Sequence, residues 1–140
     1  MSDAENKLNE LSDFFRRMSA KVKLIKLIEH AKIEYDKYNL DSSLESLEKA
    51  YKIDSGDATT LLVLGDLSYR TADYKTALKY YKNAESHNKT TTSICSVKVA
   101  QTYEMLGKEK RAVDIYEKVL KTYSDSWVAY YKIALKDKSK

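Results

Sequence analysis

Apolar side chains recur at intervals of three and four residues along most of the chain. In one stretch they fall at Ala77, Leu78, Tyr81 and Ala84, a spacing that places them on one face of an α-helix. Short polar links at 38–39, 72–73 and 106–107 separate such stretches, and links of this kind are typical of turns. The pattern therefore predicts amphipathic helices, arranged in pairs, with short turns between them.

Small residues recur at the places where the two helices of each pair would touch. Small side chains let two helix axes approach to about 8–10 Å, whereas larger ones would hold them apart. They are Ala31, Gly65 and Ala100 on the first helices and Ser43, Ala77 and Ala112 on the second.

The same positions repeat with a period of about 34 residues. The clearest copy is 61–85, in which Leu64 and Gly65 precede Ala77 and Tyr81 by fixed steps. A second copy lies 35 residues later in the chain, and a third lies 34 residues earlier. This spacing resembles the tetratricopeptide repeat (TPR), a helix-turn-helix unit with small residues at its helix contacts. The resemblance implies an all-α, TPR-like superhelix.

The resemblance also implies a division of the chain into five segments, because stacked repeats need a cap at each open end. About eight helices are expected in all. The segments are an N-terminal capping helix at 1–23, repeats at 24–57, 58–92 and 93–126, and a C-terminal capping helix with a Lys-rich tail at 127–140.

The expected N-terminal helix has two interpretations. Its apolar residues have helical spacing and include both phenylalanines of the chain. They could cover the open end of the first repeat, as solenoid caps do, or they could anchor another protein. The sequence does not decide between a cap and a binding element. The helix carries Leu8, Leu11, Phe14, Phe15 and Met18 at this spacing, and the anchor would consist of Leu11, Phe14, Phe15 and Met18.

Composition limits the chemistry that the chain can perform. With no proline and three glycines, it has few residues for the turns of a β-protein or for glycine-rich phosphate loops. His30, His87 and the single cysteine, Cys95, do not have the spacing of metal ligands. We therefore expect no enzyme activity, no metal and no cofactor.

Charge and cysteine content suggest the compartment. The 25 basic and 21 acidic residues leave a net charge of +4, and a lone cysteine cannot form an internal disulfide, which favours a reducing, cytoplasmic location. No apolar stretch approaches the roughly 18 residues of a membrane span, and the polar, acidic start is unlike a signal peptide. A membrane is therefore not an expected partner.

In proteins that resemble this family, first-helix residues line the concave face of the superhelix and bind peptides. The corresponding positions here are apolar with aromatic edges and a few cations, and Val63, Tyr69, Val97 and Tyr131 are expected to form an exposed apolar patch. This lining favours a peptide or amphipathic helix with acidic residues, and hence a protein-protein interaction adaptor. It comprises Ile28, Lys32, Tyr35, Leu62, Val63, Asp66, Tyr69, Arg70, Val97, Lys98, Gln101, Met105, Tyr131, Lys132 and Leu135.

One use of the family is a clamp for the acidic C-terminus of heat-shock chaperones. That clamp needs lysine, asparagine and arginine side chains at five positions. The matching positions hold Ile28, Lys32, Val63, Ile94 and Lys98, of which only Lys98 is chemically close. A chaperone tail is therefore a disfavoured partner.

An alternative function is that of a ribosome- or ribonucleoprotein-associated factor. Lysine neutralises phosphate without reading sequence, so a mildly basic chain permits such contacts. The lysines that could make them are Lys21, Lys23, Lys26, Lys132, Lys136, Lys138 and Lys140.

Overall fold

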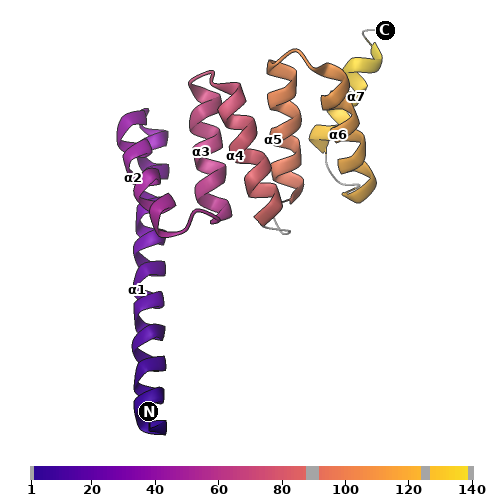
Figure 1. Ribbon diagram of the computed structural model, residues 1–140. Helices are drawn as coiled ribbons and strands as arrows, with labels where there is room; N and C mark the ends of the chain where they lie inside the picture. Colours follow the sequence, from indigo (N-terminus) through magenta and orange to yellow (C-terminus); the bar gives the residue numbers. More distant parts are fainter. Residues whose placement is uncertain (1, 88–91, 124–126, 139–140) are drawn as a thin grey trace. The chain divides into compact units, whose positions relative to one another are not determined.

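The structure is a computed structural model, and it describes residues 2–87, 92–123 and 127–138 (Figure 1). Those residues form α-helices joined by turns, without a strand, which confirms the all-α prediction. They belong to two units, 1–55 and 56–140, and each unit is described by itself. The helices are α1 (Asp3–Asp36), α2 (Leu40–Ile53), α3 (Ala58–Arg70), α4 (Tyr74–His87), α5 (Thr92–Met105), α6 (Glu109–Thr122) and α7 (Trp127–Lys138).

The first helix is much longer than expected. Residues 5–18 do not form a helix of their own but continue without a break into the first helix of the first repeat, so the described residues hold seven helices instead of eight. The physical reason is that residues 19–23 contain neither glycine nor proline to end a helix. The helix begins at a capping box, in which the Ser2 side chain accepts a hydrogen bond from the Glu5 backbone and Glu5 accepts one from the Ser2 backbone.

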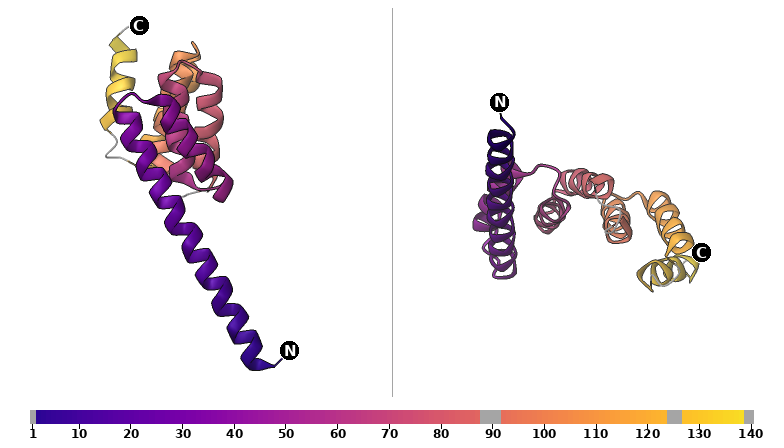
Figure 2. Two further views of the ribbon diagram at one scale, coloured as in Figure 1. Left: turned by 90° about the vertical axis from the view of Figure 1, so that its left-hand side faces the viewer. Right: turned by 90° about the horizontal axis from the view of Figure 1, so that it is seen from below.

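Only the C-terminal part of α1 packs on α2. Leu24, Ile28 and Ala50 form the buried core of this helix pair, with Leu27 and Ile53 beside them. All side chains from 2 to 23 are exposed, and Figures 1 and 2 show that α2 does not extend alongside this part of α1. The expected covering of the first repeat by residues 5–18 is therefore absent from this unit.

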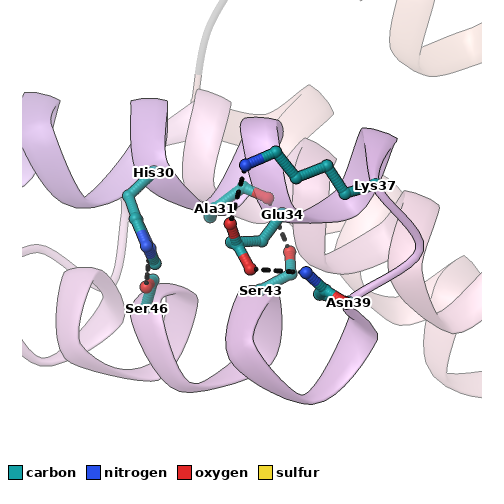
Figure 3. A network of polar contacts seen from close by, with 7 residues as sticks. All are labelled: His30, Ala31, Glu34, Lys37, Asn39, Ser43 and Ser46. Atoms are coloured by element: carbon teal, nitrogen blue, oxygen red, sulfur yellow. Dashed lines mark hydrogen bonds and ion pairs between the residues drawn. The ribbon is translucent and has the colours of Figure 1, made fainter.

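Polar contacts join α1 to α2 beside that core (Figure 3). The Ser43 hydroxyl donates to the backbone carbonyl of Ala31 at 2.8 Å, so both small residues of the predicted helix contact lie face to face. His30 Nδ1 and the Ser46 hydroxyl are hydrogen-bonded at 2.8 Å. His30 thus has a structural partner in the neighbouring helix.

The turn between α1 and α2 is held by Glu34 (Figure 3). The Asn39 side chain donates to the Glu34 carboxylate at 3.0 Å, and Lys37 lies 3.7 Å from it. The hydrogen bond from Asn39, together with the charge of Lys37, keeps the pKa of Glu34 below its ordinary value.

In unit 56–140 each helix from α3 to α7 packs on the next one along the chain. Gly65 lies against Tyr81, and a Cβ atom at position 65 would overlap the tyrosine ring. Ala77 and Ala112 are 0% and 1% exposed at the other predicted contacts. The main core consists of Ala77, Tyr81, Val99, Ala100, Tyr103, Ala112, Tyr116, Val119 and Ala129.

The turns inside the helix pairs share one backbone feature. Tyr38, Ala72 and Gly107 have φ values of 66°, 62° and 76°, the left-handed conformation that ends many helices. They are 34 and 35 residues apart, so the sequence period reappears in the backbone geometry. The sequence also predicts polar links between the pairs, of which 86–89 lies partly and 124–126 wholly outside the described residues.

Candidate functional site

A cluster of polar side chains lies between α3, α4 and α5. The Tyr81 hydroxyl donates to Asp66 Oδ1 at 2.5 Å, and Lys98 Nζ donates to the same oxygen at 2.7 Å. Lys98 also lies over the Tyr81 ring, 5.5 Å from its centre. The side chains of Lys98 and Asp66 are 30% and 29% exposed, so this cluster forms part of the surface.

A second cluster of the same kind lies between α5, α6 and α7. The Tyr116 hydroxyl donates to one oxygen of Glu104, and Lys132 Nζ donates to the other at 3.1 Å. Each cluster therefore takes an acid and a tyrosine from one helix pair and a lysine from the next helix. Of the three lysines that sequence analysis assigned to the lining, the two in this unit, Lys98 and Lys132, both have carboxylate partners within the chain.

The environment of the second cluster shifts the pKa of several groups. Burial, the hydrogen bond to Glu104 and its negative charge raise the pKa of Tyr116 far above 10.0. Burial also raises the pKa of Tyr69. On the outer side of the cluster, a hydrogen bond from Lys136 lowers the pKa of Glu109. The site is thus a set of ion pairs next to a buried, neutral phenol.

An open pocket of about 210 Å³ adjoins the second cluster. Two expected lining residues, Lys132 and Leu135, form part of its wall. Its lining combines two ion pairs with aliphatic and aromatic side chains. The residues are Glu104, Glu109, Ala112, Val113, Tyr116, Lys132, Leu135 and Lys136.

The expected lining residues of unit 56–140 differ in their exposure. Val63 is buried, at 8% exposure, so the exposed patch expected from Val63, Tyr69, Val97 and Tyr131 does not form as such. Tyr69 and Val97 are half-buried and pack on the core. The residues of the lining that are both apolar and exposed are Met105, Tyr131 and Leu135, at 51%, 56% and 47%. Leu62, Asp66, Arg70, Lys98, Gln101 and Lys132 are half-buried.

The three expected lining residues of unit 1–55 lie on α1. Ile28 is 6% exposed and belongs to the core with α2, so a ligand cannot reach it. Lys32 is exposed and lies 3.9 Å from Glu29. Tyr35 is half-buried.

Sequence analysis missed the acid of the second cluster and the role of the tyrosines. Tyr81 and Tyr116 are 35 residues apart, and Lys98 and Lys132 are 34 apart, so the repeat period could have paired them. Glu104, however, comes 38 residues after Asp66, about one helical turn beyond the repeat position. The period alone could not have found it.

Two general features of the described residues bear on function. None of their helices is both long and apolar enough to cross a bilayer. Within the same part of the chain, no group of three or more His, Cys, Asp and Glu side chains could hold a metal ion.

Comparison with known proteins identifies the repeat. Residues 95–126, which include all of α6, match the model of a family described as tetratricopeptide repeat. No curated protein matches the sequence.

Solved structures with the same fold cover most of the chain. MamA is 20% identical with a TM-score of 0.72, over 96% of this chain and 82% of that one. The first TPR of Spaghetti (RPAP3), bound to the HSP90 peptide SRMEEVD, is 15% identical with a TM-score of 0.74, over 84% and 92% of the two chains. The second TPR domain of human RPAP3, in complex with the HSP70 peptide SGPTIEEVD, is 15% identical with a TM-score of 0.73, over 82% and 95%.

These findings confirm the resemblance inferred from the sequence. The protein carries a tetratricopeptide repeat and has the all-α, TPR-like fold. The repeat boundaries at 24–57, 58–92 and 93–126 stay a prediction.

Proposed function

We propose that this protein is a non-enzymatic adaptor that binds a peptide or an amphipathic helix of a partner protein. TPR repeats generally serve as scaffolds, and two of the similar structures hold a bound peptide. The observation that carries the proposal is the combination of exposed apolar side chains with an open pocket at α5–α7. Apolar side chains that gather at the surface beside a concave pocket offer a partner apolar area to bury.

The proposed binding surface is narrower than the lining expected from the sequence. We define the α7 surface as Met105, Tyr131, Lys132 and Leu135 together with the pocket that Lys132 and Leu135 line. Ile28 and Val63 are buried and play no part in it. Apolar anchors of the partner would fill the pocket and cover the exposed tyrosine and leucine side chains.

The ion pairs modify the expected character of the ligand. An acidic residue of the ligand would have to share Lys132 with Glu104, or Lys98 with Asp66. Since such sharing weakens the attraction that each lysine offers, apolar contacts would supply most of the affinity and acidic residues would contribute mainly to the association rate.

The same contacts argue against a chaperone tail as the ligand. Of the five positions that would form the clamp, Ile28 and Val63 are buried, and Ile94 is 53% exposed but apolar. Lys98, the chemically closest match, donates to Asp66. We infer that this chain does not bind the peptides that are seen in the two RPAP3 structures.

The test uses a matched pair of tyrosines on α7. Peptides selected from a random library on the full chain would be titrated by calorimetry against wild type, Tyr131→Glu, Leu135→Glu and the control Tyr130→Glu. Tyr130 and Tyr131 are adjacent and equally exposed, at 55% and 56%, but only Tyr131 belongs to the α7 surface. A charge placed against an apolar anchor should weaken binding by about tenfold or more, and the control should bind as wild type does.

Other results would contradict the proposal. Equal binding by all four proteins would show that the selected peptides use another surface. Tight binding of SRMEEVD or SGPTIEEVD to wild type would reverse the inference about chaperone tails. Circular dichroism on each variant would establish that the helices are intact.

The ribonucleoprotein alternative has less support. Of its lysines, Lys132 pairs with Glu104 and Lys136 with Glu109, which leaves less positive charge for phosphate. The single cysteine, Cys95, is buried and forms no disulfide, which agrees with the proposed cytoplasmic location. RNA binding that is tight and survives moderate salt would favour the alternative.

A further inference from the structure

The exposed half of α1 carries a regular apolar stripe. Its residues are separated by alternating steps of four and three, and the large ones are between 47% and 68% exposed. A spacing that averages 3.5 residues is the pattern of a coiled-coil seam. We call this set the α1 stripe: Ala4, Leu8, Leu11, Phe15, Met18, Val22 and Ile25.

The α1 stripe lies on the opposite side of the helix from α2. Val22 and Ala31 are nine residues apart, which at 3.6 residues per turn places them about 180° apart around the axis. Ala31 is fully buried against α2, whereas Val22 is 47% exposed. In unit 1–55, therefore, α2 packs on the face of α1 opposite the stripe, and every residue of the stripe is exposed.

The stripe is long enough to pair with another helix. From Ala4 to Ile25 it covers 22 residues, or about 33 Å at 1.5 Å per residue. It contains three consecutive heptads, and its layers hold large side chains throughout except for Ala4. An uncovered seam of this length on a helix is a surface that another helix can bury.

Charge along the helix points to a particular occupant. Residues 2–13 hold four acids, Asp3, Glu5, Glu10 and Asp13, and one base, whereas residues 14–28 hold five bases and no acid. A second copy running in the same direction would place acid against acid and base against base. A second copy running in the opposite direction would place the acidic half of each helix against the basic half of the other.

We propose that the α1 stripe is a dimerisation surface, on which a second copy of this chain packs its own α1 in antiparallel orientation. Pairing the large residues of the stripe, from Leu8 to Ile25, fixes the register. Leu8 of one copy then faces Ile25 of the other, Leu11 faces Val22, and Phe15 faces Met18 at the centre.

The residues that flank the stripe agree with this register. The second apolar position of each heptad is held by Ala4, Leu11, Met18 and Ile25. In an antiparallel pair, the residues that directly follow these positions lie next to one another across the two helices. Here they join Glu5 of one copy to Lys26 of the other, twice per dimer, and Ser12 to Ser19. A parallel pair would instead bring Lys21 against Lys26. The two orientations thus assign opposite roles to Lys26.

A membrane surface is the other occupant that an amphipathic helix with basic residues could suit. The acidic half argues against it, because Glu5, which flanks the stripe, would lie near anionic headgroups, and Asp3, Glu10 and Asp13 add negative charge to the same half. Complementarity of the two halves favours the second copy.

The first experiment measures the mass of the full chain by sedimentation equilibrium from about 10 µM to 1 mM. Wild type should approach twice the 16.1 kDa of one chain as concentration rises. Phe15→Glu with Met18→Glu places four charges in the central layers of a dimer and should stay monomeric. The control, Arg17→Gln with Ala20→Glu, changes the net charge by the same amount off the stripe and should dimerise like wild type.

The second experiment determines the orientation. Lys26→Glu should weaken the dimer roughly five- to tenfold at low salt. It replaces each of the two attractions between Lys26 and Glu5 in the dimer with a repulsion between carboxylates. Adding Glu5→Gln, which retains the capping-box side chain, should recover most of that loss. A parallel dimer predicts the reverse, since Lys26→Glu would turn the contact with Lys21 into an attraction.

Several outcomes would overturn the proposal. They are a wild type that stays monomeric over the whole range, a dimer that survives Phe15→Glu with Met18→Glu, and a dimer that Lys26→Glu strengthens. Monomeric wild type that cosediments with phosphatidylserine vesicles would assign the stripe to a lipid surface. Peptide binding at the α7 surface is independent of all these results.

Discussion

Residues 3–23 of α1 and the helices of unit 56–140 have similar apolar periodicity but differ in what covers their apolar faces. In the second unit Leu61 and Tyr116 are each 1% exposed, whereas Leu11 and Phe15 of α1 are 53% and 66% exposed. The comparison teaches that periodicity identifies the apolar face of a helix without identifying its partner.

Small residues account for part of the difference. In unit 56–140 Gly65, Ala77 and Ala112 lie where neighbouring helices touch, and they allow close approach within short pairs. The α1 stripe has large side chains in nearly every layer, and the turn that follows α1 brings α2 back onto the opposite face of that helix. Helix pairs within a chain and a seam between chains thus have different residue patterns.

The largest expected effect comes from deleting one leucine side chain in each region. Leu61→Ala should lower the free energy of unfolding by about 2–5 kcal/mol, because it empties a buried site. Leu11→Ala should change it by less than about 0.5 kcal/mol in dilute, monomeric protein, because the side chain is already in water. Urea unfolding of both variants measures the contrast. A comparable loss for Leu11→Ala would show that residues 3–23 are packed within the chain.

Overpacking tests the helix contacts themselves. Ala77→Leu and Ala112→Leu should each cost about 1–3 kcal/mol, since both sites are fully buried. Ala20→Leu, on exposed α1, is the control and should leave the thermal midpoint nearly unchanged. If all three variants melt together with wild type, the helix contacts inferred from the repeat register are wrong.

The sequence predicted the helical fold and its contacts because these depend on local features. Gly65 and Ala77 are at helix contacts and Gly107 is at a turn, as the spacing indicated. The length of α1 differs from the prediction because the repeat period sets a boundary at residue 23, whereas no helix breaker between Met18 and Leu24 ends the helix there.

The candidate site was harder to predict because side-chain reach and burial decide it. Val63 has the register of an exposed residue and is buried. Glu104 reaches the Tyr116 hydroxyl from one turn beyond the repeat position occupied by Asp66. Whether a lysine has a carboxylate partner depends on such contacts between helix pairs. These contacts cannot be predicted from the spacing of residues in a single sequence.

The Tyr116 hydroxyl is a polar group of the packed helices in unit 56–140, and it donates a hydrogen bond to Glu104. Tyr116→Phe should cost about 1–3 kcal/mol at pH 7, because it removes a hydrogen bond to a carboxylate. The folded state raises the pKa of Tyr116, so this group stabilises the fold below pH 10 and loses that effect as the pH rises above 10, where the unfolded chain releases the proton.

Thermal melts of wild type and Tyr116→Phe between pH 7 and 11 test this directly. The difference between their midpoints should narrow above pH 10, and subtraction removes the contribution of the other tyrosines. Tyr131→Phe, with an exposed side chain, should match wild type throughout. A constant difference at all pH values would contradict the role assigned to the Tyr116 proton.

The smallest expected effect concerns the turns, which the repeats have and the first 36 residues lack. Ala72 holds the left-handed conformation with φ of 62°, which costs an L-residue about 1–2 kcal/mol, whereas glycine adopts it freely. Ala72→Gly should therefore stabilise the chain by up to about 1 kcal/mol after the entropy of the unfolded glycine is subtracted.

Gly107→Ala should destabilise the chain by about 1 kcal/mol. Since no atom lies within 4 Å of a Cβ added at Gly107, that loss would measure backbone strain alone. Urea midpoints that move in the same direction for both variants would show that the turns at 72 and 107 are not equivalent.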